Sequence, residues 1–169
     1  MVKRRENRRG PSRSQKRLFF QGYGGDHSSL IAAAIYLGLL PGDRVPSQAE
    51  ILSLRHFDGL SNDELGRVLF LGTDERGIDV YVIGSGPARD MVPRAVRSFL
   101  GLNGLEPGLA EFVDCLPLAG LLTRAGGFLS RRLGLIWIGR NLAAYGIRRN
   151  YRRFVGLAQS VRDRVRGKP

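Results

Sequence analysis

The residues best suited to chemistry lie in one glycine-rich turn, which consists of Gly22, Tyr23, Gly24, Gly25, Asp26, His27, Ser28 and Ser29. Glycines allow a tight bend and bring backbone amides close to a ligand. The apolar residues after the turn predict a buried helix, whose unpaired first amides and positive dipole end would face the same place. With the serine hydroxyls, these groups predict a binding loop for an anion, the phosphate of a small molecule or nucleotide.

Two side chains of the turn, His27 and Ser29, are candidates for a catalytic role. Histidine gains and loses protons near neutral pH, which suits a general acid or base, and Ser29 would be a hydroxyl ligand. The alternative is structural: the glycines only make the turn, Ser28 caps the helix, and His27 fixes the loop through a backbone hydrogen bond. We favour the functional interpretation, because strand-to-helix loops at the carboxyl edge of a sheet are where ligands bind in such folds.

The turn shares the outer frame of the phosphate-binding P-loop, G-x-x-x-x-G-K-[ST]. When Gly22 is aligned with the first glycine, Ser28 occupies the lysine position and Ser29 the metal-binding hydroxyl. The lysine that reaches the terminal phosphates is therefore missing, which disfavours a triphosphate hydrolase. His27 also replaces the third glycine of the dinucleotide pattern G-x-G-x-x-G. The motif thus predicts a degenerate phosphate loop and leaves both the cofactor and the question of enzymatic activity open.

Groups elsewhere in the chain give weaker signals. Asp114 follows an apolar strand, where a magnesium-orienting acid would lie in a P-loop protein; its alternative role is a helix cap or a local salt bridge. Cys115 lacks the arginine six residues later that a phosphatase loop needs, since that residue is Leu121, so we expect a buried core thiol. The two histidines, His27 and His56, lack H-x-x-x-H spacing, and no metal site is predicted.

The composition indicates an ordinary folded protein. The 169 residues suit one domain, and a hydrophobic content of 43% suffices for a core. The one cysteine excludes a disulfide within the chain and a multi-cysteine zinc site. The charged start does not resemble a secretory signal, and no apolar run is long enough for a spanning helix, so we expect a cytoplasmic location. The segment 118–139 could lie on a membrane surface, but its flanking arginines fit a packing helix better.

The net charge of +12 is concentrated at the two ends of the chain. Residues 1–17 and residues 148–169 each carry +7, whereas residues 18–147 carry −2. Basic arms bind polyanions by releasing counterions, which suggests an alternative function: a non-enzymatic regulatory or interaction module that contacts nucleic acid or an acidic partner. The arms could equally be solubilising tails.

The pattern of apolar residues predicts an α/β fold with a mostly parallel, doubly wound sheet, a P-loop-like first strand-turn-helix unit and one antiparallel hairpin. We expect a disordered basic arm over 1–16 and a single α/β domain over 17–166. The predicted strands are 18–20, 68–72, 79–84, 112–116 and 142–147. The predicted helices are 28–38, 47–54 with a capping box from Ser47 to Glu50, 90–100, 118–133 with a break at Gly126-Gly127, and 150–165.

Several segments resemble an uncharacterised bacterial family, a domain-of-unknown-function family associated with spore-forming bacteria. They are Tyr23-Gly24-Gly25-Asp26-His27-Ser28-Ser29 (a Tyr-Gly-Gly-x-His-Ser-Ser motif), Leu37-Gly38-Leu39-Leu40-Pro41, Gly72-Thr73-Asp74, Gly126 to Gly134 and Ala144-Tyr145-Gly146-Ile147. The resemblance covers most of residues 18–157 and excludes the amino-terminal arm. It implies a self-contained domain and supplies no activity, cofactor or catalytic residue.

Overall fold

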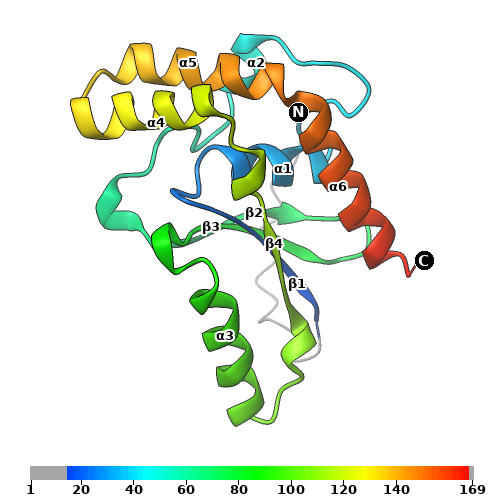
Figure 1. Ribbon diagram of the computed structural model, residues 1–169. Coiled ribbons are helices and arrows are strands. Elements are labelled where there is room, and N and C mark those ends of the chain that lie inside the picture. Colours follow the sequence, from blue (N-terminus) through cyan, green and yellow to red (C-terminus); the bar gives the residue numbers. More distant parts are fainter. Residues whose placement is uncertain (1–14, 168–169) are drawn as a thin grey trace.

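The computed structural model describes residues 15–167, without the side chains of residues 62, 131 and 132 (Figure 1). The predicted basic arm over residues 1–16 therefore lies almost entirely outside the described residues. No helix in the described part of the chain is long and apolar enough to cross a membrane.

A four-stranded sheet forms the centre of the fold, in the order β2 (Val68–Thr73), β3 (Asp79–Gly84), β1 (Arg17–Gly22) and β4 (Ala110–Asp114). The central strand β1 runs parallel to both β3 and β4. Strands β2 and β3 form the antiparallel hairpin that the sequence predicts. The expected fold class, α/β with a mostly parallel sheet and one antiparallel pair, is confirmed.

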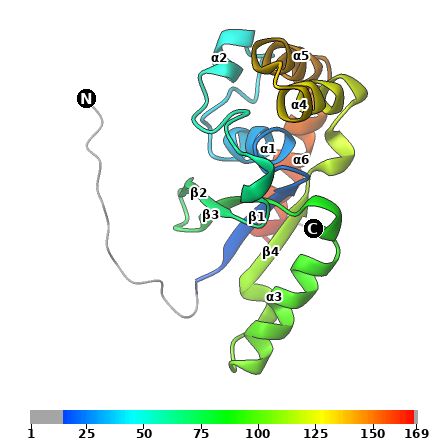
Figure 2. The ribbon, with the colours of Figure 1, turned by 90° about the vertical axis from the view of Figure 1, so that its left-hand side faces the viewer.

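Six α-helices are distributed unequally over the two faces of the sheet. In order they are α1 (Ser28–Tyr36), α2 (Gln48–Leu52), α3 (Met91–Leu102), α4 (Leu121–Leu133), α5 (Ile136–Arg149) and α6 (Tyr151–Val165). Figure 2 shows α3 on one side of the sheet and the other five helices on the opposite side. The described residues also form four short 3-10 helices: Asn62–Glu64, Gly86–Ala88, Pro107–Leu109 and Leu116–Leu118.

Strand β1 separates the two faces because its side chains alternate in direction. Leu18 and Phe20 are fully buried in the core beneath α1. Phe19 points to the other face, where its ring stacks on Tyr81 at 5.2 Å and on Phe112 at 4.9 Å between ring centroids. The core face is therefore aliphatic and aromatic, and an aromatic ladder crosses the opposite face.

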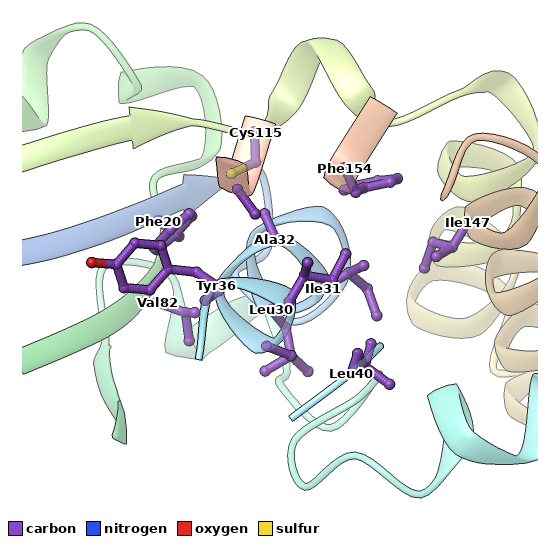
Figure 3. Packing of buried hydrophobic residues seen from close by; sticks show 14 of the residues in the cluster. Phe20, Leu30, Ile31, Ala32, Tyr36, Leu40, Val82, Cys115, Ile147 and Phe154 are labelled. Carbon is purple, nitrogen blue, oxygen red and sulfur yellow. The ribbon is translucent and has the colours of Figure 1, made fainter. Parts of the chain in front are cut away.

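Helix α1 is the centre of the core, since every one of its residues is buried. Figure 3 shows its side chains between the sheet on one side and Phe154 and Ile147 on the other. Phe154, Ala158 and Val161 recur at helical spacing on α6, and all three are fully buried. This arrangement fixes the amino-terminal end of α1, where the predicted binding loop lies.

Some local predictions are confirmed. Both hydrogen bonds of the Ser47–Glu50 capping box are present at the start of α2. Gly38 has a φ of 74°, as expected just after the end of α1. Cys115 is a fully buried core residue.

Two local predictions are wrong. Residues 142–147 form part of α5 and not a strand, and α4 continues through Gly126-Gly127 without a break. The reason is tertiary: a Cβ on Gly126 would lie 2.5 Å from the backbone nitrogen of Ala143. The small residues of both segments allow α4 and α5 to pack with their backbones in contact. The glycines therefore serve helix packing and do not end α4.

Candidate functional site

The carboxyl ends of three parallel strands meet where the predicted loop begins. Gly22 at the end of β1 lies beside Gly84 at the end of β3, and Gln21 lies beside Asp114 of β4. The chain leaves β1 for α1 on one face of the sheet and leaves β3 for α3 on the other (Figure 2). Adjacent strands with connections on opposite faces create the crevice in which α/β proteins bind ligands.

Close backbone contacts hold the loop after β1 against the end of β3. Gly25 has a φ of 87°, and a Cβ on it would lie 2.7 Å from the backbone nitrogen of Gly84. The backbone N–H groups of Ser85 and Gly86 donate to the carbonyls of Gly22 (3.0 Å) and Tyr23 (2.9 Å). The loop is therefore fixed by contacts that only glycine permits.

The loop borders a cavity of about 660 Å³ whose opposite wall is α4. The lining residues are Gly22, Tyr23, Gly24, Gly25, His27, Ser28, Ser29, Leu65, Leu116, Ala119, Thr123, Arg124, Gly127 and Phe128. All eight residues of the predicted loop except the buried Asp26 thus contribute to one cavity. Helix α4 adds hydroxyl, guanidinium and aromatic groups that the sequence alone did not assign to the site.

Two hydroxyls on the cavity wall have no hydrogen-bond partner among the described residues. They are Ser29 Oγ at the start of α1 and Thr123 Oγ1 in the first turn of α4, and both side chains are buried. A buried hydroxyl without a partner costs free energy, so both hydroxyls have hydrogen-bonding capacity that the described residues leave unused. A Cβ on Gly22 would lie 2.9 Å from Ser29 Oγ, so the absence of a side chain at Gly22 leaves room for that hydroxyl.

The amino-terminal end of α1 is also without a side-chain cap. His27 occupies the N-cap position and makes no capping hydrogen bond, and no acidic residue lies in the first turn. The first amide bonded within the helix is that of Ile31, which donates to the His27 carbonyl at 2.9 Å. The amides of residues 28–30 precede it and have no acceptor within the helix. Positive potential from these amides is therefore directed at the cavity.

A second cluster adjoins the cavity around the ring of His27. Asp58 Oδ1 lies 3.0 Å from Nε2 and Asp26 Oδ1 lies 3.4 Å from Nδ1. The other oxygen of Asp58 accepts a 2.5 Å hydrogen bond from Ser130 Oγ, and that of Asp26 accepts a 3.2 Å hydrogen bond from the backbone N–H of Leu60. One ligand atom from each of Asp26, His27 and Asp58 lies within 4.8 Å of the others. Such nitrogen and oxygen donors suit a proton relay or a divalent cation.

Sequence reasoning missed Asp58, Thr123 and Ser130 as members of this region. They come from a loop and a helix distant in sequence, and no motif for binding or catalysis contains them. Asp58 does have an unusual backbone, with a φ of 52°. Asparagine and aspartate tolerate this conformation better than most residues, so the sequence carries no warning of it.

The other predicted groups lie elsewhere or have local partners. Asp114 lies 3.4 Å from the guanidinium of Arg89 and accepts a hydrogen bond from the backbone N–H of Leu116. These are the contacts expected of its structural role. Burial raises the pKa of the Cys115 thiol above its ordinary value, so the thiol stays protonated and unreactive. His56 is not among the residues that line the cavity.

The topology and the loop together define a mixed α/β protein with a glycine-rich strand-turn-helix unit at the carboxyl edge of its sheet. The chain belongs to the family described as protein of unknown function (DUF3189), whose profile matches residues 17–163. The expected membership of an uncharacterised family is thereby confirmed. No curated protein and no solved structure matches the chain.

Proposed function

We propose that the cavity binds a phosphate-bearing small molecule, with the phosphate at the start of α1. The observation that carries this proposal is the buried Ser29 hydroxyl, which lines the cavity and has no hydrogen-bond partner in the described chain. The uncapped amides of α1 and the hydroxyl of Thr123 supply further donors on the same cavity. Arg124 adds a positive charge that is suited to phosphate.

The size of the cavity supports a ligand larger than inorganic phosphate. A volume of about 660 Å³ lies within the range of roughly 300–1,000 Å³ that is typical of small-molecule sites. Tyr23, Leu65 and Phe128 give part of the lining an apolar and aromatic character. A phosphate ester with an apolar or planar body, such as a nucleotide, matches this division into polar and apolar walls.

His27 is the group that we assign to proton transfer in this site. Its ring lines the cavity, and the nearby Asp58 carboxylate is itself held by Ser130. The carboxylates of Asp58 and Asp26, one beside each ring nitrogen, hold the imidazole in its orientation. The catalytic role of His27 rests on the binding function, because a general acid or base must lie within reach of a bound ligand.

Isothermal titration calorimetry with inorganic phosphate and with adenosine monophosphate tests the binding function. We expect both to bind and the nucleotide to bind more tightly. Ser29→Ala should weaken both by about tenfold or more, since a hydrogen bond to a charged group contributes roughly 1.5–3 kcal/mol. Ser29→Ala should not lower the free energy of unfolding, because the lost hydroxyl makes no bond within the described protein.

The matched control is Ser160→Ala, on the exposed side of α6, whose hydroxyl donates to the Leu157 carbonyl. It should bind both ligands like the wild type. Absence of binding in the wild type, or equal affinities of the wild type and Ser29→Ala, would refute the proposal.

A further inference from the structure

Three exposed arginines lie near the cavity, at the end of the α4–α5 pair where α5 meets α6. We call Arg124, Arg149 and Arg153 the arginine cluster. Arg124 lies in the first turn of α4 and itself lines the cavity. Its Nε donates a 3.0 Å hydrogen bond to the carbonyl of Ala119, which anchors the guanidinium there. Figure 1 shows that α4 and α5 run in opposite directions, so α4 begins near the junction of α5 and α6.

Arg149 lies beside the part of α4 that forms the cavity wall. A Cβ on Gly146 would lie 2.7 Å from the backbone nitrogen of Thr123, which lines the cavity. Residues three apart are neighbours on one face of a helix. Arg149 therefore lies on the face of α5 that packs against the cavity-lining turn of α4, just beyond that contact.

Arg153 lies on the same side, because the junction of α5 and α6 touches the start of α4. A Cβ on Gly120 would lie 2.5 Å from Nδ2 of Asn150, the residue between the two helices. Arg153 follows Asn150 by three residues, and its backbone N–H donates to the Asn150 carbonyl at 2.9 Å. The arginine cluster thus surrounds the contact between Gly120 and Asn150, and Gly120 directly follows the cavity-lining Ala119.

The positive charge of the arginine cluster is not neutralised by any carboxylate of the described residues. No ion pair in the described part of the chain includes one of the three arginines. Residues 115–162 contain nine arginines and no lysine, aspartate or glutamate. Guanidinium groups bind phosphate through paired N–H donors. The arginine cluster therefore extends the positive character of the cavity outward over the neighbouring surface.

We propose that the arginine cluster binds the phosphate backbone of a single-stranded nucleic acid whose terminal nucleotide occupies the cavity. This inference rests on the proposed function, because the terminal phosphate is the one that the start of α1 would hold. Arginines that contact the backbone position a strand without reading its sequence. Tyr23 and Phe128, which line the cavity and are 50% and 56% exposed, give the terminal base an apolar ring to stack on.

Other polyanions fit these features less well. An acidic protein would satisfy the arginines but would bring no phosphate to Ser29 and no planar group to the cavity. A duplex would contact the arginines through its backbone, but its last nucleotide is held in a base pair. A free mononucleotide would fill the cavity and leave Arg149 and Arg153 without an anion. A single strand with an unpaired end supplies the terminal phosphate, the base and the following phosphates together.

Calorimetric titration of the full-length protein compares adenosine monophosphate with a short single-stranded oligoadenylate that carries a terminal phosphate. We expect the oligoadenylate to bind about tenfold or more tightly, since each additional phosphate contact releases counterions. Its affinity should also fall more steeply with sodium chloride. On a plot of log affinity against log salt, each additional contact to a single strand should add about 0.7 to the slope.

Arg149→Gln combined with Arg153→Gln removes two exposed positive charges. This double variant should bind the oligoadenylate about tenfold more weakly or worse, with a salt slope that is lower by about 1.4 for two lost contacts. The matched control is Arg94→Gln combined with Arg97→Gln, because these arginines are exposed on α3, on the opposite side of the sheet (Figure 2). The control has the same net charge and should bind the oligoadenylate like the wild type.

Ser29→Ala tests whether the strand enters the cavity. It should weaken the binding of the oligoadenylate as well as that of adenosine monophosphate, because the terminal phosphate of both ligands lies at the start of α1. A variant that weakens only adenosine monophosphate would show that the strand binds outside the cavity, and the inference would be wrong.

Three further results would overturn the inference: equal losses in the two double variants, an affinity for the oligoadenylate that is independent of salt, and equally tight binding of a polyglutamate peptide. The last result would assign the arginine cluster to an acidic protein. Absence of binding of adenosine monophosphate to the wild type refutes the proposed function itself. Binding of adenosine monophosphate without any gain from the oligoadenylate leaves the proposed function intact and refutes only the role of the arginine cluster.

Discussion

Gly25 shows how strictly single residues control the candidate site. Its φ of 87° belongs to the left-handed region, and its α-carbon faces the backbone of Gly84. Gly84 in turn leaves no room for a Cβ, which would lie 2.6 Å from the carbonyl carbon of Gly24. Two glycines in direct contact therefore set the position of the loop relative to the sheet. The open side of the loop, which lines the cavity, depends on this contact.

We expect Gly25→Ala to destabilise the protein by roughly 2–5 kcal/mol, because it combines a left-handed backbone with a backbone clash. Gly38→Ala is the control, since Gly38 has a φ of 74° but no atom within 4 Å of the added Cβ. It should cost about 1 kcal/mol, the conformational effect alone. Urea unfolding followed by circular dichroism measures both. Equal losses in the two variants would show that the contact with Gly84 is unimportant.

The sequence predicts a turn at Gly22–Ser29 because a turn depends on local residues, and a cluster of glycines favours the backbone conformations of a tight bend. It does not predict Thr123 or Ser130, because their contribution depends on where α4 docks. Nor does it reveal Asp58 as the neighbour of His27, since that contact joins two loops. The part of the candidate site that lies in one continuous segment can therefore be predicted from the sequence. The part that depends on the packing of distant segments cannot.

At the scale of elements, the pair α4 and α5 depends on small residues at its contact surface. Gly126, Gly139 and Gly146 each lie so close to the partner helix that an added Cβ would be within 2.7 Å of one of its atoms. Glycine lowers helix propensity, so a local interpretation takes Gly126-Gly127 for a break and the segment 142–147 for a strand. Tertiary contact outweighs that preference, which explains why these two predictions fail.

Gly126→Ala should destabilise the protein by roughly 1–3 kcal/mol, the usual effect of overpacking. It should also weaken phosphate binding, because displacement of α4 moves Thr123 on the cavity wall. Gly156→Ala, inside α6 with no atom within 4 Å of the added Cβ, should stabilise the protein by about 0.5–1 kcal/mol. Thermal unfolding and phosphate titration of both variants measure these effects. A stabilising Gly126→Ala would contradict the close contact of the two helices.

Across the whole molecule, polar side chains connect parts of the chain that are far apart in sequence. Tyr151 at the start of α6 donates a 2.6 Å hydrogen bond to the Pro41 carbonyl. Tyr36 at the end of α1 donates a 2.7 Å hydrogen bond to Asp74 in the β2–β3 turn. The guanidinium of Arg162 donates to the carbonyls of Ile35 and Tyr36 and so joins α6 to the end of α1. The bond from Tyr36 joins the helical layer to the sheet, and the bonds from Tyr151 and Arg162 join α6 to the rest of that layer.

The two tyrosines predict the behaviour of the fold at high pH. Burial raises the pKa of Tyr151 from its ordinary value of 10.0 to about 12. Burial, followed by the hydrogen bond to Asp74, raises the pKa of Tyr36 still further. The unfolded chain loses these protons near pH 10, whereas the folded protein retains them. Their contribution to stability is therefore complete below pH 10 and is lost as the pH rises above 10, through about 12 for Tyr151.

Urea unfolding at pH 8.5, 10 and 11 should show this loss in the wild type. Tyr151→Phe should lower the free energy of unfolding by about 1 kcal/mol at pH 8.5, since it removes the hydrogen bond to Pro41. Its stability should then fall less steeply above pH 10, because the variant has one fewer phenol to ionise on unfolding. Tyr145→Phe, at an exposed position on α5, should retain the wild-type slope. If Tyr151→Phe and the wild type lose stability in parallel up to pH 11, the ionisation of Tyr151 does not contribute to the loss, and the prediction is wrong.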